Sequence, residues 1–378
     1  MFPWVRPKNS AIMFDVGTTG IRACQLARRG PSLVLRDHLR LALHAAGDTP
    51  DPGGALDCDR LVRTLTQARF AGRSVGLVLS PPAVQFHTLE VPERLLSNSR
   101  EAIHKALAWE IARETRTEPG QWEVRYWPFP SGHRPGRNVM SVAVSSPLVR
   151  GWVSDFARHG LRLTRVTASP CALARVAAAA WPPEEEDVWG VLDVGHGRSV
   201  LTVLVARSPV YVRVVATGAA DWSGRLARAF DVSAEEARQI MERHGLRQPD
   251  AAARGGPEAQ DAQQLHTQAS LCSVLFATLR PALDALVREI NRCFLYVLES
   301  YPNLSVSRLF VAGGGGGLGG LPEYLELQLD LPTRRLMGAA APENGPDGLG
   351  IVAADVPPET AASLGGSLLD VEAPSCSR

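Results

Sequence analysis

The sequence has almost no lysine. Only Lys8 and Lys105 occur in 378 residues, so arginine supplies nearly all of the positive charge, and 40 basic residues balance 39 acidic ones to a formal net charge of +1. A near-neutral chain offers no extended basic field, and such a field is what attracts the phosphates of nucleic acids. We therefore expect no nucleic-acid partner.

Long hydrophobic runs are also missing. No stretch approaches the roughly 20 consecutive apolar residues that a membrane-spanning helix needs. Residues 1–10 carry charges and prolines where a signal peptide would have its apolar core. These absences predict a cytoplasmic protein without direct membrane insertion, which reaches a membrane only through partners.

Residues that bind metals through sulfur or imidazole are few and scattered. Histidines such as His87 and His104 show no paired spacing. The six cysteines show none either, which predicts reduced and mostly buried thiols: Cys24, Cys58, Cys171, Cys272, Cys293 and Cys376.

What the sequence does contain is a strand-to-turn motif that occurs twice. Apolar residues 11–14 lead into Asp15, and apolar residues 189–192 lead into Asp193. Each aspartate opens a tight turn, formed by Gly17, Thr18, Thr19 and Gly20 in the first copy and by Gly195, His196, Gly197 and Arg198 in the second.

These turns have a functional and a plain interpretation. Glycines let backbone N–H groups approach an anion, and two facing carboxylates could hold the water shell of Mg²⁺ between them. Alternatively, each aspartate only ends a strand, because Asp and Gly dominate turns. Arg22 could reach phosphate oxygens from the first turn or the strand after it, or it could be a solvated surface arginine. The repetition favours the metal and phosphate interpretation for Asp15 and Asp193.

A third glycine segment follows another strand-like run, residues 310–312. Backbone without Cβ atoms could pack flat against an adenine ring and ribose, or the segment could be a flexible linker. Its continuation into a helix that begins near Pro322 favours an ordered loop. The segment comprises Gly313, Gly314, Gly315, Gly316 and Gly317, and the three glycine loops together indicate a nucleotide cleft between two related halves.

The order of expected strands and helices divides the chain. Residues 10–74 and 146–183 are expected to form a first lobe, interrupted by a strand–strand–helix–strand–strand subdomain at 75–145. A linker at 182–186 precedes a second lobe at 187–370. In this second lobe Pro281 is expected to kink or split a long helical region at about 262–300.

Three tryptophans fall in the inserted block. Trp109, Trp122 and Trp127 could pack in its core, or they could line a peptide-binding groove.

These residues resemble the actin-like ATPase superfamily, and within it the PilM-type type IV pilus assembly proteins. Residues 15–22 resemble the family's first phosphate motif, 193–201 its second and 311–321 its adenosine motif. The likeness continues between the motifs, at 89–92, 173–175 and 226–237, and it covers about residues 10–370.

The resemblance implies an α/β fold: an actin-like, ribonuclease H-like duplicated two-lobe structure with a small α+β subdomain inserted in the first lobe. It implies a cytoplasmic scaffold, recruited to the inner membrane face, that holds the N-terminal cytoplasmic tail of a PilN-like bitopic membrane protein by the inserted subdomain. Pilus motor or platform proteins would be further partners, and self-association is left open. ATP with Mg²⁺ would be a structural or regulatory ligand, hydrolysed slowly if at all.

The sequence departs from the family pattern at several cofactor positions. Arg238 and Met241 stand where a Glu and a Lys commonly contact ribose and adenine. Arg198 replaces a hydroxyl residue, and Ala219 follows Gly218 where a second glycine is usual. Thr167 and Ser169 occupy positions that are often acidic. Together the departures suggest a weakened or lost nucleotide site, so retained and lost ATP binding both stay open.

Two other functions fit the same superfamily. A small-molecule kinase needs a general base for its acceptor hydroxyl, and the sequence offers no candidate beyond Asp15 and Asp193. A division-type filament tether usually ends in an amphipathic membrane helix, and residues 371–378 predict none.

Overall fold

The computed structural model describes residues 9–30, 32–42, 58–65, 68–92, 100–181, 183–184, 186–246, 262–337 and 358–372. Part of the expected linker (Pro182 and Glu185), Cys376 and the rest of the terminal segment 373–378 lie outside this range. None of the described helices combines the length and the apolar character needed to cross a membrane. The five described cysteines are free, and four of them are buried, as predicted.

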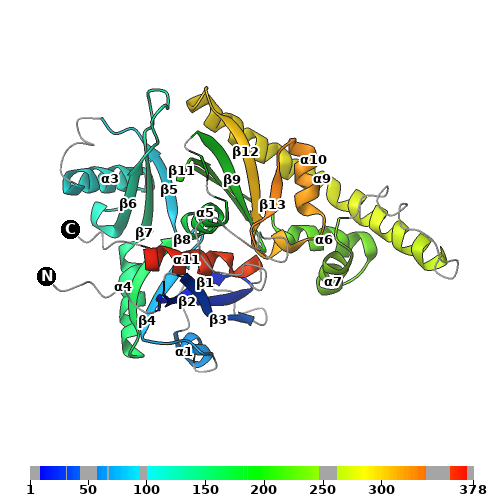
Figure 1. The fold of residues 1–378 in the computed structure, drawn as a ribbon, viewed down its shortest axis with the longest axis horizontal. Helices are drawn as coiled ribbons and strands as arrows, with labels where there is room; N and C mark the ends of the chain where they lie inside the picture. The colour runs from blue at the N-terminus through cyan, green and yellow to red at the C-terminus, as the bar shows by residue number, and fades with distance from the viewer. Residues whose placement is uncertain are drawn as a thin grey trace.

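Each of the two lobes contains a five-stranded sheet, and both sheets have the same strand order (Figure 1). In each sheet, three neighbouring strands pair antiparallel with one another. The remaining two strands run parallel to the strand that comes first in that half of the chain, β1 or β9. The first sheet has the order β3 (Ser32–Ala42), β2 (Gly20–Arg29), β1 (Ile12–Gly17), β4 (Ser74–Leu79), β8 (Arg162–Ala168). The second has the order β11 (Ser208–Val215), β10 (Ser199–Val205), β9 (Asp187–Val194), β12 (Ser305–Ala312), β13 (Thr333–Arg335). The shared order confirms the predicted duplication.

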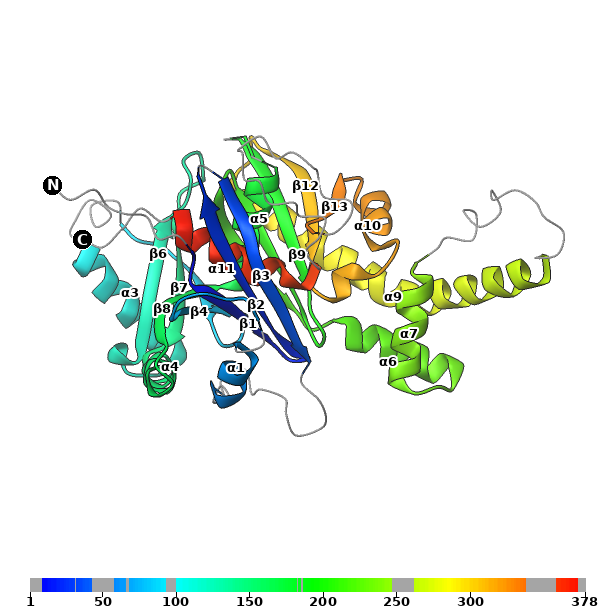
Figure 2. The ribbon, with the colours of Figure 1, turned by 60° about the horizontal axis from the view of Figure 1, so that its bottom comes forward.

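Two helices fill the space between the sheets (Figure 2). The α5 helix (Ser169–Ala180) contacts strands of both sheets, and α11 (Ala361–Glu372) lies against α5 and against β1, β2 and β4. Small residues permit this close packing, since five of the nine buried residues of α5 are alanine. A short 3-10 turn, η4 (Pro358–Thr360), precedes α11. The sequence predicted a second lobe at 187–370, which would include most of α11. Because α11 packs on the first sheet, we propose to assign it to the first lobe.

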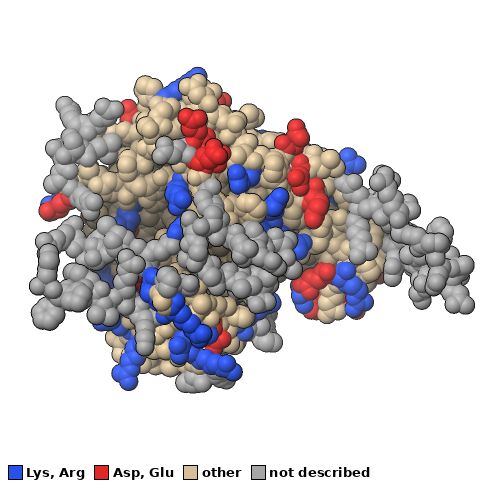
Figure 3. Space-filling view, in the orientation of Figure 1, with Lys and Arg blue, Asp and Glu red and all other residues tan. Residues whose placement is uncertain are grey.

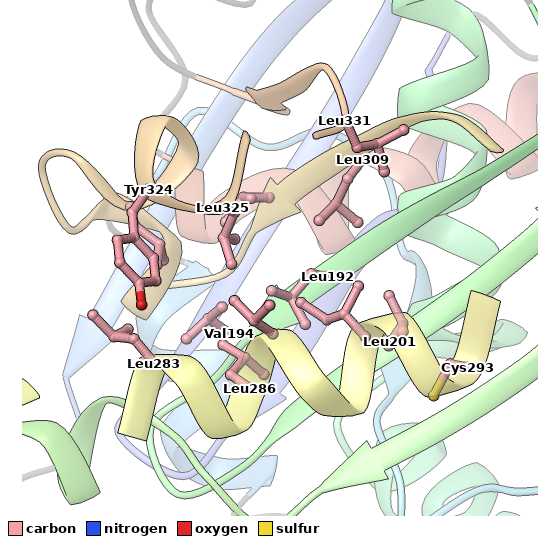
Figure 4. Packing of buried hydrophobic residues seen from close by; sticks show 14 of the residues in the cluster. Leu192, Val194, Leu201, Leu283, Leu286, Cys293, Leu309, Tyr324, Leu325 and Leu331 are labelled. Atoms are coloured by element: carbon pink, nitrogen blue, oxygen red, sulfur yellow. The ribbon is translucent and has the colours of Figure 1, made fainter. Parts of the chain in front are cut away.

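The outer face of the second sheet is covered by a long helix, α9 (Ala262–Ser300). Figure 4 shows Leu286 of α9 beside Leu192 and Val194 of the sheet, and Leu283 of α9 beneath Tyr324 of α10. This helix continues through Pro281, so the expected split does not occur. Three shorter helices complete the lobe: α6 (Ala219–Phe230), α7 (Ala234–His244) and α10 (Leu321–Leu329).

A three-stranded antiparallel sheet forms the inserted subdomain, in the order β5 (Gln85–Leu89), β7 (Val139–Ser145), β6 (Trp122–Pro128). Its helix α3 (Arg100–Thr115), followed by the turn η1 (Pro119–Gln121), buries Ile103, Leu107 and Ile111 against the sheet. The α4 helix (Ser146–Arg158) returns to the first lobe, where α1 (Cys58–Leu65) also packs. Since β4 pairs with β1 and β8, we propose that the insert covers 85–145 rather than 75–145.

The three tryptophans of the insert do not share one groove. Trp122 packs against the core of the subdomain and donates its indole N–H to Thr117 Oγ1 at 2.7 Å. Trp127 donates its indole N–H to the Pro209 carbonyl of β11 at 2.8 Å, which joins the insert to the second lobe. Trp109 remains 67% exposed on α3.

Basic and acidic side chains occur on both lobes in the view of Figure 3. Basic side chains gather over the strands of the first sheet, and one group of acidic side chains lies over α10.

Candidate functional site

A cavity of about 910 Å³ lies between the two lobes, where both aspartate turns meet the third glycine loop. Most of the residues singled out from the sequence line it: Asp15, Gly17, Thr18, Thr19, Arg22, Asp193, Gly195, His196, Gly197, Arg238, Met241, Gly313, Gly314 and Gly315. Five others do not, including Thr167 of β8 and Ser169 at the start of α5. Gly20 begins β2, Gly218 caps α6, and Gly316 lies against Val311.

The first two loops are the tips of equivalent hairpins. In the β1–β2 hairpin, Gly17 pairs with Gly20, so Thr18 and Thr19 form a two-residue turn. In the β9–β10 hairpin, Val194 pairs with Ser199, and the turn between them is closed by Gly195 N–H donating to the Arg198 carbonyl at 3.0 Å. The duplicated sheets therefore bring two related turns to one cavity.

The second turn is fixed by the first turn of α6. The N–H groups of Ala219 and Ala220 donate to the carbonyls of Gly195 and His196, at 3.0 and 2.8 Å. A Cβ added at Gly218 would lie 2.6 Å from the Arg198 nitrogen, closer than real Cβ atoms come. Gly218 thus supports the turn by its small size and does not itself reach the cavity.

The third loop is an ordered turn. Gly313 has φ of +80°, and the following residues form the 3-10 helix η2 (Gly315–Gly317), closed by Gly316 N–H donating to the Gly313 carbonyl at 3.1 Å. A Cβ at Gly313 would overlap Asp193 Oδ1 and lie 2.5 Å from the Val194 carbonyl oxygen. The backbone therefore approaches the second aspartate directly.

Asp15, Asp193 and Arg22 lie at the centre of the cleft. Arg22 Nη1 is 3.6 Å from Asp15 Oδ2, with side chains 12% and 10% exposed. Burial raises the pKa of Asp15, against the lowering effect of Arg22. Burial, and then the charge of Asp15, raises the pKa of Asp193 to about 7, again opposed by Arg22. The two carboxylates sense one another, as two groups facing a shared pocket do.

The raised pKa of Asp193 predicts that stability falls as pH rises toward neutrality. Between its ordinary value of 3.8 and about 7, the folded chain keeps a proton that the unfolded chain has released, so raising the pH favours unfolding across this window. The Asp193→Asn variant cannot ionise there. We expect its melting temperature to exceed that of the wild type by a larger margin at pH 8 than at pH 5. Equal margins in thermal unfolding followed by circular dichroism would contradict the shifted pKa.

The α7 wall of the cavity carries two carboxylates beside Arg238. Arg238, where the sequence predicts the loss of an acceptor for ribose hydroxyls, donates from its Nε to Glu235 Oε2 at 2.9 Å, and its Nη1 pairs with Glu242. Both glutamates also line the cavity. Carboxylate acceptors are therefore present one helical turn away, neutralised by Arg238, while Met241 is buried and fills the wall.

Other lining residues were missed in the sequence. Arg40 of β3 pairs with Glu359 at 2.8 Å, and Ser80 donates to Ser169 Oγ at 2.8 Å near the floor. Trp152 also lines this region, and its buried indole N–H has no hydrogen-bond partner among the described residues. A signal existed for Ser80, because it directly follows the carboxyl end of the parallel strand β4, where ligands of α/β sheets bind.

The donor set fits phosphate better than it fits a metal ion held by protein side chains. The described residues contain no group of three or more His, Cys, Asp or Glu side chains that could hold a metal. The buried Nε of Arg22 has no partner among them, and glycines at 17 and 313 leave space that a Cβ would fill. If a nucleotide binds, the two hairpin turns and Arg22 would hold its phosphates, and Glu235 and Glu242 would face its ribose.

Comparison with known proteins supports the fold. No protein-family model and no curated protein matches the chain. A structure titled "PilM-PilN type IV pilus biogenesis complex" is 20% identical, with 97% of this chain and 100% of that chain covered and a TM-score of 0.69. MreB 5 of Spiroplasma citri bound to AMPPNP is 10% identical, with 97% of both chains covered and a TM-score of 0.52. At these identities the similarity is one of fold, and this chain has the actin-like two-lobe fold that its sequence predicts.

Proposed function

We propose that the chain is an actin-like scaffold of a type IV pilus or related secretion assembly. It acts in the cytoplasm at the inner membrane face, where it binds the N-terminal tail of a PilN-like bitopic protein and, through it, the pilus motor or platform. A nucleotide in the cleft is a structural or regulatory ligand that holds the lobes together.

The observation that carries this proposal is the full-length fold match, insert included. Only 3% of this chain, or about 11 residues, lies outside the match to the chain from the PilM–PilN complex. The inserted subdomain, with its three strands and α3, is far longer than that. The subdomain therefore lies within the span of the match to a chain of the PilM–PilN complex, which supports the proposal.

The cleft itself favours a binding role over rapid turnover. Five carboxylates line it, and four of them are in ion pairs: Asp15 with Arg22, Glu235 and Glu242 with Arg238, and Glu359 with Arg40. Asp193 has no ion pair in the part of the chain that is described, but it lies against Gly313. At the ends of β4 and β8 the chain presents the hydroxyls of Ser80 and Ser169, which are poor general bases. A kinase would need a carboxylate beside an acceptor hydroxyl, so this alternative is disfavoured.

The insert offers a docking surface on α3. Trp109 is the most exposed large apolar side chain among the described residues. Lys105 and Arg113 lie one turn before and after it on the same helix face, in solvent-exposed ion pairs with Glu101 and Glu110. Exposed aromatic side chains of this kind often supply most of the binding energy of an interface. We propose that the tail packs on Trp109.

Replacing this tryptophan tests the proposal. A synthetic peptide with the cytoplasmic N-terminal residues of a PilN-like protein is titrated into the full chain by calorimetry, with and without ATP. The wild type should bind in both conditions. Trp109→Ala should weaken binding by about 30-fold, the loss of roughly 2 kcal/mol that truncating an aromatic anchor causes.

Leu327→Ala provides the matched control. Leu327 is an exposed apolar side chain at 63% on α10 of the second lobe, and its truncation should leave the affinity within about twofold. No binding of the peptide to the wild type would remove the scaffold proposal. An equal loss of peptide affinity in both variants would show that the docking site is not on α3.

A further inference from the structure

A guanidinium group occupies the space between the three loops of the cleft. A Cβ added at Gly17 would lie 2.6 Å from Arg22 Nη1, and one added at Gly314 would lie 4.0 Å from Arg22 Nη2. The same side chain pairs with Asp15, and its charge also acts on Asp193. Arg22 therefore spans from the first hairpin to the third loop, beside both aspartates.

A second arginine, without a carboxylate partner among the described residues, lines the cavity from the other lobe. Four arginines line the cavity within the described part of the chain: Arg22, Arg40, Arg198 and Arg238. Three of them pair with carboxylates, and Arg198, on the second hairpin turn, has no ion pair with a described residue. Its charge is therefore available to a ligand.

This arrangement is unfavourable for a divalent cation at the two aspartates. An ion between them would be repelled by Arg22 at short range, and it would compete with Arg22 for Asp15. Arg22 already occupies the Asp15 carboxylate, at 3.6 Å between Nη1 and Oδ2, so an ion bound there would have to displace it.

The same arrangement is favourable for phosphate. Each guanidinium presents a planar fork of N–H donors that matches two phosphate oxygens, and it stays charged at all physiological pH values. Arg22 belongs to the first lobe and Arg198 to the second, and both line the cavity, so the two side chains together could hold a phosphate chain between the hairpin turns.

We propose that this cleft binds the phosphates of a nucleoside di- or triphosphate without a divalent cation, with Arg22 and Arg198 supplying the positive charge that Mg²⁺ would otherwise bring. The inference rests on the proposed function only in taking a nucleotide as the ligand of the cleft. The proposal also explains why an arginine at position 198 replaces the usual hydroxyl residue, because its positive charge takes the place of the metal ion.

Calorimetric titration of ATP into the full chain tests this, once in excess EDTA and once with magnesium chloride. The dissociation constants should agree within about threefold. Arg198→Gln should weaken ATP binding by about tenfold or more in both buffers, since hydrogen bonds to charged groups contribute about 1.5–3 kcal/mol. Arg207→Gln is the matched control, because Arg207 is exposed in the turn at the opposite end of β10. It should leave the affinity unchanged.

Three results would overturn the inference. ATP binding that disappears in EDTA and returns with magnesium would place the metal back in the site. Equal affinities of Arg198→Gln and wild type would remove Arg198 from it. ATP binding in neither buffer, with tail-peptide binding intact, would show that the cleft takes no nucleotide, while the scaffold proposal would stand.

Discussion

Gly365→Ala is expected to lower the free energy of unfolding by about 2–3 kcal/mol. A Cβ at this position of α11 would overlap the Ala172 carbonyl oxygen of α5 and lie 3.0 Å from the Ala172 Cα. These are backbone atoms of a packed helix, so one helix must shift, and overpacking of this kind usually costs about 1–3 kcal/mol. Because α5 and α11 fill the space between the two sheets, the shift would also loosen the contact between the lobes. Urea unfolding followed by circular dichroism measures the loss.

Gly151→Ala separates this clash from the intrinsic preference of helices for alanine. Gly151 lies inside α4, and nothing lies within 4 Å of a Cβ added there. In open space the substitution should raise stability by up to about 1 kcal/mol. If Gly365→Ala behaved like Gly151→Ala, the close packing of α5 on α11 would be wrong.

Gly313→Ala should damage both the stability of the chain and the cleft. The position has φ of +80°, where a side chain costs about 1–2 kcal/mol, and its Cβ would overlap Asp193 Oδ1. Displacing Asp193 or the third loop separates elements that must meet around the ligand. We expect a total loss of about 3 kcal/mol in stability, from strain and overpacking together, and at least a tenfold loss in affinity for ATP by calorimetry.

Gly72→Ala is the control for backbone strain alone. Gly72 has φ of +85°, almost the same conformation, but nothing lies within 4 Å of an added Cβ. It should lose only about 1–2 kcal/mol and bind ATP normally. Comparable ATP affinities for the two variants would mean that the approach of Gly313 to Asp193 does not matter for binding.

The centre of the cleft was predictable because it is built from local motifs that repeat. An apolar run, an aspartate and a glycine turn specify a hairpin tip by themselves, and two copies imply a duplicated sheet. The third loop was recognisable for the same reason, since its glycines follow a strand and precede a helix. The position and turn type of each loop are therefore specified by a short local stretch of sequence.

The features missed depend on contacts between distant segments. The strand β4 looks like the partner of β5 along the sequence, but it pairs in parallel with β1 and β8, and only the sheet reveals this. The strand β8, Arg162–Ala168, carries two arginines and lies at a sheet edge, so its apolar pattern is weak. Similarly, α11 is far from the first sheet in sequence and packs on it in space.

The charge pairing around Arg238 was not visible in the sequence. Arg238 alone suggests the loss of a ribose acceptor, and the structure places two glutamates, three positions before it and four after it, in ion pairs with it on the same wall.

Pro281 predicted a kink or a split of the long helix, and α9 is not split there. Its many buried contacts with the second sheet outweigh the lost hydrogen bond.

The melting temperature of the full chain as a function of ATP concentration tests the central claim most directly, namely that the two lobes share a cleft stabilised by a bound nucleotide. At an ATP concentration about a hundredfold above the dissociation constant, binding adds about 2.7 kcal/mol to stability. For a chain of this length that corresponds to a rise of about 3 °C. A rise that grows with the logarithm of ATP concentration, with the ATP recovered intact, is the predicted result. An unchanged melting temperature up to millimolar ATP would contradict the claim that a nucleotide stabilises the cleft.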